Sequence, residues 1–306
     1  MKKKVWIDGS AGTTGLRILE RLEQRTDLEL IRLSEENRKD PAARKEAMEK
    51  ADLAFLCLPD DAAKEASEWE EAKETVIIDT STAHRTSPGW TYGFPELTGK
   101  SAISASKRIA NPGCHASGFL ALTAPMVKNK LLRSDARLSC TSLTGYSGGG
   151  KKMIAQYEAP DRNALFDAPR LYALEQKHKH LKEMQAISGL IYAPVFLPIV
   201  APFYSGMEVI VPLFENDRTA SPDAIRECYR ETFRDGLVKW EDEAEDGFLS
   251  ASALSGKDTM KVGVYGNEER LLLIARFDNL GKGASGSAIQ NMNLVFGFPE
   301  EEGLVK

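Results

Sequence analysis

Residues 5–22 read VWIDGSAGTTGLRILERL, and this stretch decides the fold. A short apolar run ends at Asp8, three glycines follow (Gly9, Gly12 and Gly15), and apolar residues then recur at helical spacing. A glycine-rich turn between a strand and a helix lets backbone amides approach a pyrophosphate, and the helix amino terminus favours the anion. The spacing is G-x-x-G-x-x-G, so the position of the turn, more than its spacing, predicts a dinucleotide site. A tight turn of small residues that packs a helix on a sheet is the alternative.

Strands and helices alternate through the first hundred residues. Apolar runs at residues 28–33, 53–58 and 76–78 predict strands, and residues 41–50 and 60–69 have the composition of helices. Strands that alternate with helices need crossover connections, so we predict a largely parallel sheet covered on both faces. The first part of the chain is therefore predicted to be an α/β, doubly wound nucleotide-binding domain of the Rossmann type.

The pattern changes after about residue 135, where strands predominate. Two helices are predicted there, over residues 173–187 and 223–233, and a last helix over residues 284–296. The β-like segments are residues 138–143, 190–200, 209–214, 262–265 and 271–277. We predict a second, α+β domain with a mixed or antiparallel sheet.

The composition describes an ordinary globular protein. The chain has 306 residues, 42% of them hydrophobic and 28% charged, and a net charge of −5, which gives no reason to expect a nucleic-acid surface. No apolar run approaches the roughly 18 residues of a membrane span. Residues 2–4 resemble the start of a signal peptide, but Asp8 interrupts the apolar stretch that follows. Four scattered cysteines form no disulfide framework, which predicts a reduced, cytoplasmic protein.

The most specific local feature is NPGCHASG at residues 111–118. A proline and a glycine end the preceding segment, and a helical stripe follows, so Cys114 is expected in the first turn of a helix. The helix dipole and the unpaired amides there favour a thiolate over a thiol. Cys114 is therefore predicted to be a nucleophile, whereas Cys57, Cys140 and Cys228 lie in apolar segments and are predicted to be packing residues.

A cysteine nucleophile usually needs a base, and the chain has four histidines. His178 and His180 are two residues apart and cannot share a helical face, but at a helix start or in an extended turn both can line a pocket. Glu183, three residues beyond His180, is placed to hydrogen-bond its ring. A solvated charged helix explains the same pattern equally well. Zinc is disfavoured, because the cysteines form no close pair and the histidines lack i, i+4 spacing, so no metal is predicted.

Cofactor type depends on the end of the second strand. Ser34 and Arg38 suit the 2′-phosphate of NADP, while Glu35 and Glu36 weaken that interpretation. Two further glycine-rich stretches, residues 145–152 and 278–286, can bring backbone close to a ligand, and each carries lysine suited to an anion. Flexible loops are the alternative for both.

Taken together, these segments resemble the N-acetyl-gamma-glutamyl-phosphate reductase family of arginine biosynthesis, in its shorter form. The pairing of NPGCHASG with DNLGKGASGSAIQNMNLVFG, residues 278–297, makes the resemblance specific. It extends from residue 4 to about residue 303, and the broader semialdehyde dehydrogenase superfamily shares the layout.

The resemblance implies an NADP-dependent reductase with a Rossmann domain and an inserted catalytic domain that also forms subunit contacts. We place the Rossmann domain at residues 1–114 and 281–306 and the catalytic domain at residues 115–280, in a homo-oligomer, dimer or tetramer. Cys114 matches the family nucleophile, which attacks the acyl phosphate to give a thioester. His178 matches the first histidine of an H-x-H-x-x-E segment and is our choice of general acid/base.

The remaining site residues follow from the same resemblance and from the motifs above. His180 and Glu183 match substrate-contacting members of the H-x-H-x-x-E segment, and Arg85 and Lys151 are candidates for anionic groups of the substrate. The cofactor-binding residues are predicted to be Gly9, Ser10, Ala11, Gly12, Thr13, Thr14, Gly15, Ser34, Arg38, Ser81, Asn279, Gly281 and Lys282.

Other functions fit parts of the pattern. An aspartate-semialdehyde dehydrogenase-like reductase would use the same nucleophile and cofactor on a shorter acyl phosphate, although the H-x-H-x-x-E segment favours the acetylglutamyl substrate. A carrier-bound aminoadipyl phosphate is a further substrate of the same kind. A non-catalytic NADP-binding sensor would keep the fold without the chemistry, and the presence of both Cys114 and His178 argues against it.

Overall fold

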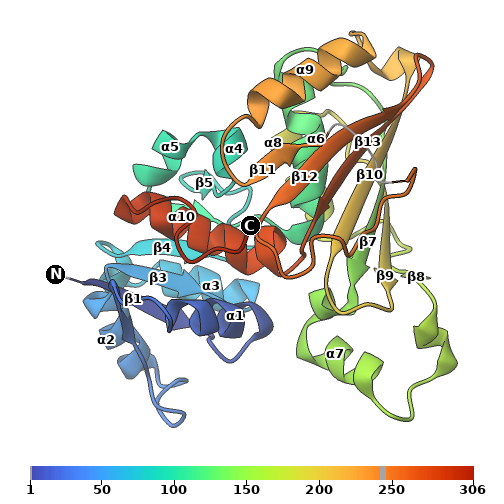
Figure 1. Cartoon of the computed structure of the whole chain (residues 1–306). Helices are drawn as coiled ribbons and strands as arrows, with labels where there is room; N and C mark the ends of the chain where they lie inside the picture. Colours follow the sequence, from blue (N-terminus) through green and yellow to red (C-terminus); the bar gives the residue numbers. More distant parts are fainter. Residues whose placement is uncertain (1, 242–245) are drawn as a thin grey trace. The chain divides into compact units, whose positions relative to one another are not determined.

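The computed structural model describes residues 2–241 and 246–306, which divide into two compact units (Figure 1). The first comprises Met1–Pro112 and Ala284–Leu304, and the second comprises Gly113–Gly283 and Val305–Lys306. The domain bounds expected from the sequence, residues 1–114 and 281–306 against residues 115–280, differ from these by a few residues and stay a prediction. Each unit is built around its own β-sheet.

A six-stranded sheet forms the centre of the first unit, with strand order β2-β1-β3-β4-β6-β5 and every neighbouring pair parallel. The predicted α/β class and parallel sheet are confirmed. The strands β6 and β5, at one edge of the sheet, were not predicted from the sequence. The strands are β1 (Lys3–Asp8), β2 (Leu28–Ile31), β3 (Leu53–Leu56), β4 (Val76–Asp79), β5 (Thr91–Tyr92) and β6 (Arg108–Ala110).

One helix of the first unit, α2 (Pro41–Lys50), begins at a side-chain cap. The Asp40 side chain accepts a hydrogen bond from the Ala43 amide, and Pro41 occupies the first helical position, so the helix predicted over residues 41–50 forms there. The helices are α1 (Thr13–Leu22), α2 (Pro41–Lys50), α3 (Asp60–Ser67), α4 (Pro95–Thr98), α5 (Lys100–Ser104) and α10 (Gly286–Phe296), with a 3₁₀ turn η1 (Glu70–Ala72).

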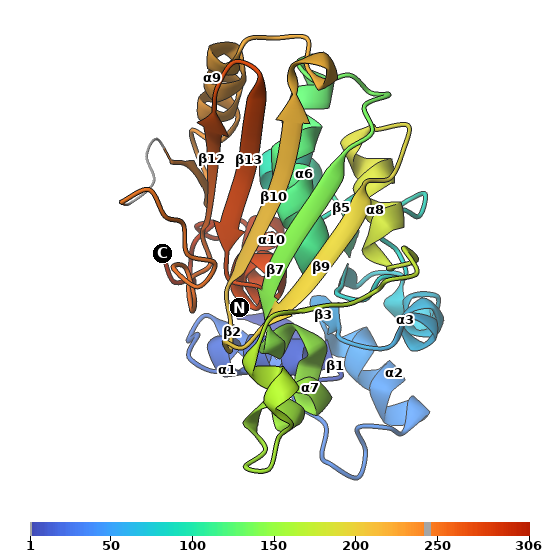
Figure 2. The same ribbon diagram turned by 90° about the vertical axis from the view of Figure 1, so that its right-hand side faces the viewer.

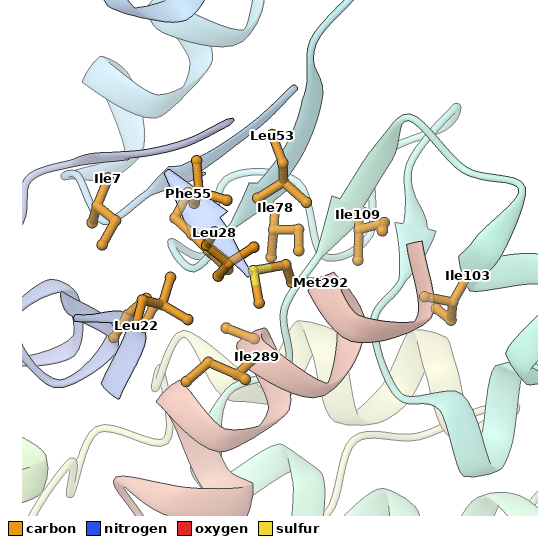
Figure 3. Close-up of a cluster of buried hydrophobic side chains, with 13 residues drawn as sticks. Ile7, Leu22, Leu28, Leu53, Phe55, Ile78, Ile103, Ile109, Ile289 and Met292 are labelled. Atoms are coloured by element: carbon orange, nitrogen blue, oxygen red, sulfur yellow. The ribbon is translucent and has the colours of Figure 1, made fainter. Parts of the chain in front are cut away.

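Both faces of this sheet are buried, because successive apolar residues of each strand point to opposite sides. On one face Phe55 and Ile78 pack with Ile289 and Met292 of α10, as Figure 3 shows. On the other face the neighbouring Ala54 belongs to a cluster with buried residues of α2 and α3. The continuous apolar runs in the sequence therefore correspond to strands covered on two sides.

Polar side chains on α10 hold it within the first unit. The Asn291 amide group donates to the Gly93 carbonyl oxygen at 2.9 Å, and that of Asn293 donates to the Glu300 carbonyl oxygen at 3.0 Å. Both asparagines are fully buried, where polar groups need partners. The polar residues in this otherwise apolar helix are explained by these bonds.

The second unit contains a mixed sheet of seven strands, which confirms the predicted second domain class. Its order is β11-β12-β13-β10-β7-β9-β8, with parallel pairing in β11–β12 and β7–β9 and antiparallel pairing elsewhere. The strands are β7 (Ser139–Gly145), β8 (Arg170–Leu171), β9 (Val195–Ala201), β10 (Met207–Phe214), β11 (Val238–Trp240), β12 (Met260–Gly266) and β13 (Arg270–Phe277).

Helices cover one face of the second sheet. Figure 2 shows α6 (Cys114–Lys128), α8 (His180–Ser188) and α9 (Pro222–Thr232) behind the long strands, and among the described residues no helix covers their opposite face. Packing of α6 is close, since a β-carbon at Gly118 would lie 2.5 Å from a side-chain carbon of Val209. The other helical segments are α7 (Gly150–Glu158), η2 (Tyr146–Gly149), η3 (Ala164–Asp167), η4 (Glu215–Asp217) and a π-helical turn, η5 (Gly281–Ser285).

The helix predicted over residues 173–187 is wrong in its first half, because α8 begins only at His180. Ala173 and Gln176 have φ angles of 52° and 53°, which an α-helix does not accommodate. The Gln176 side chain accepts a hydrogen bond from the Phe196 amide at 2.8 Å and donates to the Phe196 carbonyl oxygen at 2.7 Å. Residues 173–179 are thus held against β9 as turns.

None of the helices among the described residues is long and apolar enough to cross a bilayer.

Candidate active site

Cys114 is the first residue of α6, directly after the N-cap residue Gly113. The N-cap has no side chain to satisfy the first amides of this 15-residue helix, so they and the helix dipole favour negative charge at the cysteine. Cys114 is half-buried, so its sulfur remains partly accessible. Its location matches the helix start expected from the sequence.

The other cysteines lie in settings that disfavour a thiolate. Burial raises the pKa of Cys57 to about 12, and burial also raises the pKa values of Cys140 and Cys228 above the ordinary thiol value. All four cysteines are free thiols. The three packing assignments agree with this geometry, and Cys114 is the cysteine at a helix start.

Glu183 fixes the turn that carries Cys114. Its side chain is only 2% exposed, and its Oε1 accepts a hydrogen bond from the Gly113 amide at 2.8 Å. A buried carboxylate is thus hydrogen-bonded to the backbone amide of the residue directly before the cysteine. The sequence analysis expected Glu183 to bind the substrate or the His180 ring, and both roles stay predictions.

The segment after β13 also lies against Cys114. A β-carbon at Gly283 would be 3.0 Å from the Cys114 β-carbon and 3.1 Å from the Asp278 carbonyl oxygen, so only glycine fits there without displacement. The second of the two glycine-rich stretches is therefore next to the cysteine. Gly283 itself was not among the predicted site residues.

His178 and His180 lie close together, because the first is in the turn before α8 and the second begins the helix. Their ring centroids are 4.8 Å apart, and the His180 amide donates to Nδ1 of His178 at 3.3 Å. The prediction that a helix start can bring both rings to one place agrees with this geometry. Burial, and then the positive charge of Lys179, lowers the pKa of His178, so its neutral form persists below the usual range.

His115 completes a cluster of three histidines, and its role was not recognised in the sequence. Its ring centroid lies 5.7 Å from that of His178 and 5.4 Å from that of His180. Nδ1 is 2.7 Å from the Ser142 hydroxyl oxygen, and Nε2 is 2.8 Å from the Tyr172 hydroxyl oxygen. Burial, assisted by the charge of His178, lowers the pKa of His115 to about 3, so this ring is neutral at physiological pH.

Two predicted site residues, Arg85 and Ser81, have structural contacts. Arg85 is buried and donates to the carbonyl oxygens of Asn111 at 2.9 Å and Thr80 at 3.2 Å. Ser81 is also buried, and its hydroxyl group donates to the Asp79 carboxylate at 2.8 Å. Their predicted roles in substrate and cofactor binding stay predictions, as does that of Lys151, which is exposed on α7.

The glycine-rich stretch that begins at Asp278 also holds backbone in place. Asn279 accepts a hydrogen bond from the Gly206 amide at 2.9 Å and donates to the Ser147 hydroxyl oxygen at 3.0 Å. A β-carbon at Gly281 would be 2.1 Å from the Lys257 carbonyl oxygen, and the Lys282 side chain is buried. Asn279, Gly281 and Lys282 stay predicted cofactor contacts.

In the first unit, the glycine turn leaves the start of α1 open. Gly9 has a φ of +82°, and a β-carbon there would be 2.3 Å from the Cys57 carbonyl oxygen. A β-carbon at Gly15 would be 2.4 Å from the Gly9 carbonyl oxygen, whereas at Gly12 the nearest atom is 3.4 Å away. No side chain caps the helix, so its amino-terminal amides can meet an anion.

A cavity of about 590 Å³ adjoins this turn, a size that suits a small-molecule cofactor. Its lining includes Gly9, Ser10 and Ala11 of the turn together with basic residues from the segment after β2. Arg38 lines it and pairs with Glu35 at 2.7 Å. The Ser34 hydroxyl oxygen instead accepts a hydrogen bond from the Asn37 amide at 3.3 Å, within its own turn.

Among residues 2–241 and 246–306, no three or more histidine, cysteine or acidic side chains are arranged to hold a metal ion.

Family models of two domains match this chain. Residues 4–105 match the NAD binding domain of semialdehyde dehydrogenase, and residues 114–279 match the dimerisation domain of the same family. The chain is 41% identical to an N-acetyl-gamma-glutamyl-phosphate reductase 2 of a Nostoc species, over 99% of each chain. It is 45% identical to an N-acetyl-gamma-glutamyl-phosphate reductase of Brucella suis, over 97% of this chain and all of that protein.

Solved structures share the fold at lower sequence identity. An aspartate semialdehyde dehydrogenase II from Vibrio cholerae superposes with a TM-score of 0.75 at 21% identity, over 97% of this chain and 99% of that one. Aspartate semialdehyde dehydrogenase from Francisella tularensis gives a TM-score of 0.71 at 14% identity, over 96% and 100%. At these identities the likeness concerns the fold.

Proposed function

This chain belongs to the N-acetyl-gamma-glutamyl-phosphate reductase family of semialdehyde dehydrogenases, and from that membership we propose that it reduces N-acetyl-L-glutamyl 5-phosphate to N-acetyl-L-glutamate 5-semialdehyde, with release of phosphate, in arginine biosynthesis. The observation that carries the proposal is Cys114 at the start of α6, beside a cluster of three histidines. A half-buried thiol at a helix amino terminus is suited to attack an acyl phosphate.

The first unit supplies the nicotinamide cofactor site. Its glycine turn fits a pyrophosphate, because Gly9 and Gly15 have no room for a side chain and the α1 amides are uncapped. When bound, the dinucleotide supplies the hydride that the reduction needs. We assign NADP as the cofactor, because Arg38 and Lys39 line the cavity beside Glu35 and can meet a 2′-phosphate.

The second unit supplies the chemistry. The Cys114 thiolate attacks the acyl carbon, a carbon–sulfur bond forms, and the bond to the phosphate oxygen breaks to leave a thioester. After reduction the former carbonyl oxygen carries negative charge, and His178 delivers a proton to it. Breakage of the carbon–sulfur bond then returns the electron pair to sulfur, the hydroxyl proton passes to the sulfur, and the aldehyde and thiol are released.

The assignment of His178 as general acid/base is supported by its setting. It is less buried than His115, and its lowered pKa keeps it mostly neutral at physiological pH, so it can accept the proton of the Cys114 thiol before returning one to the oxyanion. His115 is a poor candidate, because a pKa of about 3 keeps it from carrying a proton. We retain His180 as a substrate contact.

The second unit also provides a surface for a second copy of the chain. The uncovered sheet face carries apolar rows, since Leu143 pairs with Ile199 and Ile210 pairs with Ile274 in register. Val195 on the same face is 59% exposed. We propose that this face forms a homo-oligomer, and that the enzyme works in the cytoplasm, where its four free thiols stay reduced.

A phosphate-dependent assay of the reverse reaction tests the function. The enzyme, NADP and phosphate are mixed with N-acetylglutamate semialdehyde, aspartate semialdehyde or a carrier-bound aminoadipate semialdehyde, and NADPH formation is followed. Faster turnover of the acetylated substrate by at least a hundredfold in kcat/KM is expected. Preference for aspartate semialdehyde would support the shorter acyl phosphate, turnover only with a carrier-bound aminoadipate semialdehyde would support that substrate, and no turnover with any semialdehyde would support a sensor.

A further inference from the structure

We propose that Gln176 is a positioning residue for His178. Its side chain takes the place of a strand residue at the edge of β9 and thereby fixes the turn that carries the His178 ring. The inference rests on the proposed function, because it takes His178 to be the general acid/base. Gln176 acts through that ring and need not touch the substrate.

The edge of β9 that faces β8 is paired first by backbone and then by a side chain. Directly after β8, the Tyr172 amide donates to the Pro198 carbonyl oxygen at 3.0 Å, and the antiparallel register would next place residue 174 opposite Phe196. The Gln176 side chain occupies that position instead. Its Nε2 donates to the Phe196 carbonyl oxygen at 2.7 Å, and its Oε1 accepts from the Phe196 amide at 2.8 Å. One side-chain amide thus satisfies both backbone groups of Phe196.

The backbone between Tyr172 and Gln176 leaves the sheet in a tight turn. Ala173 and Gln176 have φ angles of 52° and 53°, a region that residues other than glycine rarely adopt. The Gln176 amide donates to the Ala173 carbonyl oxygen at 3.1 Å. Such a conformation costs free energy and persists where surrounding contacts hold it. The two hydrogen bonds from the Gln176 side chain to β9 are contacts of this kind.

The His178 ring follows two residues later and lies among four other rings. Its centroid is 5.2 Å from that of Phe196, 5.8 Å from that of Tyr172, 4.8 Å from that of His180 and 5.7 Å from that of His115. Phe196, His180 and His115 are buried, so the fold holds their rings in place. His178 is only half-buried, and its position against these rings therefore depends on the path of the turn.

The hydrogen bonds of His178 itself join it to α8 and not to the sheet. The Leu181 amide donates to the His178 carbonyl oxygen at 3.0 Å, and the His180 amide donates to its Nδ1 at 3.3 Å. The link between the turn and β9 comes from Gln176. If that link is lost, the ring can move within the site, and a displacement of about 1 Å can cost about a hundredfold in rate.

Two variants of Gln176 test the link in the phosphate-dependent assay. Gln176→Met keeps the length of the side chain and removes both hydrogen bonds, whereas Gln176→Gly removes the side chain and accepts the positive φ without strain. Both should lower kcat by roughly tenfold to a hundredfold and leave KM within about twofold, because the acid/base moves while the substrate contacts remain. Melting temperatures should stay within about 4 °C of that of the unmodified enzyme.

Gln185→Met is the matched control. The Gln185 side chain, on α8, donates to the Ile191 carbonyl oxygen at 2.7 Å, so the variant also loses a hydrogen bond from a glutamine side chain to backbone in the same unit. This bond does not hold the turn that carries His178, and kcat should stay unchanged.

A double-variant cycle tests whether Gln176 acts through His178. In the His178→Asn background, Gln176→Met should lower kcat no further, because the effects of residues that act as one unit are not additive. A second measurement needs no turnover. The His178 ring is titrated by NMR of histidine-labelled protein, with its signal identified by its loss in His178→Asn. Burial lowers the pKa of His178, so Gln176→Met, which lets the ring meet water, should raise that pKa toward about 6.5.

The outcomes separate this inference from the proposed function. A normal kcat in Gln176→Gly would overturn it, since backbone strain would then explain any loss in Gln176→Met. A raised KM at unchanged kcat, equal losses with and without His178, or a similar loss in Gln185→Met would also overturn it. If His178→Asn is as active as the unmodified enzyme, the acid/base assignment is wrong, and the NMR titration alone decides whether Gln176 positions the ring. An unchanged titration of His178 in Gln176→Met would then overturn the inference.

Discussion

Replacing Glu183 with alanine should damage both the stability of the second unit and the reaction. The carboxylate is 2% exposed and accepts a hydrogen bond from the Gly113 amide at 2.8 Å, directly before Cys114. Removal of the acceptor leaves a buried amide without this partner, which costs about 1–3 kcal/mol. For a unit of this size, about 2 kcal/mol lowers the melting temperature by roughly 4–8 °C.

The same change should slow turnover, because the Gly113 turn sets the position of the sulfur. A displacement of about 1 Å in an active site can cost about a hundredfold in rate, so we expect kcat to fall by roughly tenfold to a hundredfold. Differential scanning fluorimetry and steady-state kinetics measure the two effects. Glu183→Gln is the matched control, since its amide oxygen can still accept the Gly113 hydrogen bond. It should lose less than half as much stability as alanine.

An exposed glutamate provides a control that should have no effect. Glu231 is exposed on α9, and Glu231→Ala should change neither the melting temperature nor kcat. If Glu183→Ala behaves like Glu231→Ala, the carboxylate does not hold the turn. If Glu183→Gln is as inactive as alanine while remaining stable, Glu183 contacts the substrate, as the sequence analysis expected, rather than acting mainly on the backbone.

Three further changes probe the cofactor turn, the buried ring and the cofactor type. Gly15→Ala should lower the melting temperature of the protein, because its β-carbon would be 2.4 Å from a carbonyl oxygen, whereas Gly12→Ala should fold normally; equal melting temperatures would refute this. His115→Gln should reduce the loss of stability at acid pH. Below pH 6.5 the His115 ring binds a proton in the unfolded chain but not in the folded protein, where its pKa is about 3. The free energy of unfolding therefore falls by about 1.4 kcal/mol per pH unit as the pH decreases from about 6.5 to about 3. Urea unfolding at several pH values measures that slope, and an unchanged slope in the variant contradicts it. Arg38→Met should weaken NADP binding at least tenfold in calorimetric titration and leave NAD binding nearly unchanged. The exposed ion pair with Glu35 holds the arginine only weakly, so Arg38 can turn to the 2′-phosphate. Equal losses of affinity for both cofactors would show that Arg38 does not bind the 2′-phosphate.

Local sequence signals predicted the first unit well. Its strands alternate with helices and bury both faces, so the apolar runs and the caps such as Asp40 with Pro41 are visible in the chain. The short strands β5 and β6 were missed, because strands of two or three residues carry little periodicity. The start of α8 was misplaced because Gln176 is held by Phe196, a contact twenty residues away.

Local sequence motifs also suggested some residues of the candidate site, whereas contacts between distant segments hid others. Cys114 and the His178–His180 pair belong to short motifs, and the helix start at Cys114 is visible in the local sequence. Tyr172 and Ser142 have no motif of their own, since only the fold brings β7 and the turn before α8 to His115. The backbone role of Glu183 was likewise hidden, because its partner lies seventy residues earlier.

Cys114 should become acylated during the reaction. Rapid mixing of the enzyme with NADP and N-acetylglutamate semialdehyde, without phosphate, should give a burst of about one NADPH per subunit, because the thioester has no acceptor. Mass spectrometry of the quenched protein should find an N-acetylglutamyl group on the peptide containing Cys114, and Cys114→Ser should give neither burst nor adduct. Steady NADPH formation without phosphate, or an adduct on another residue, would contradict the account.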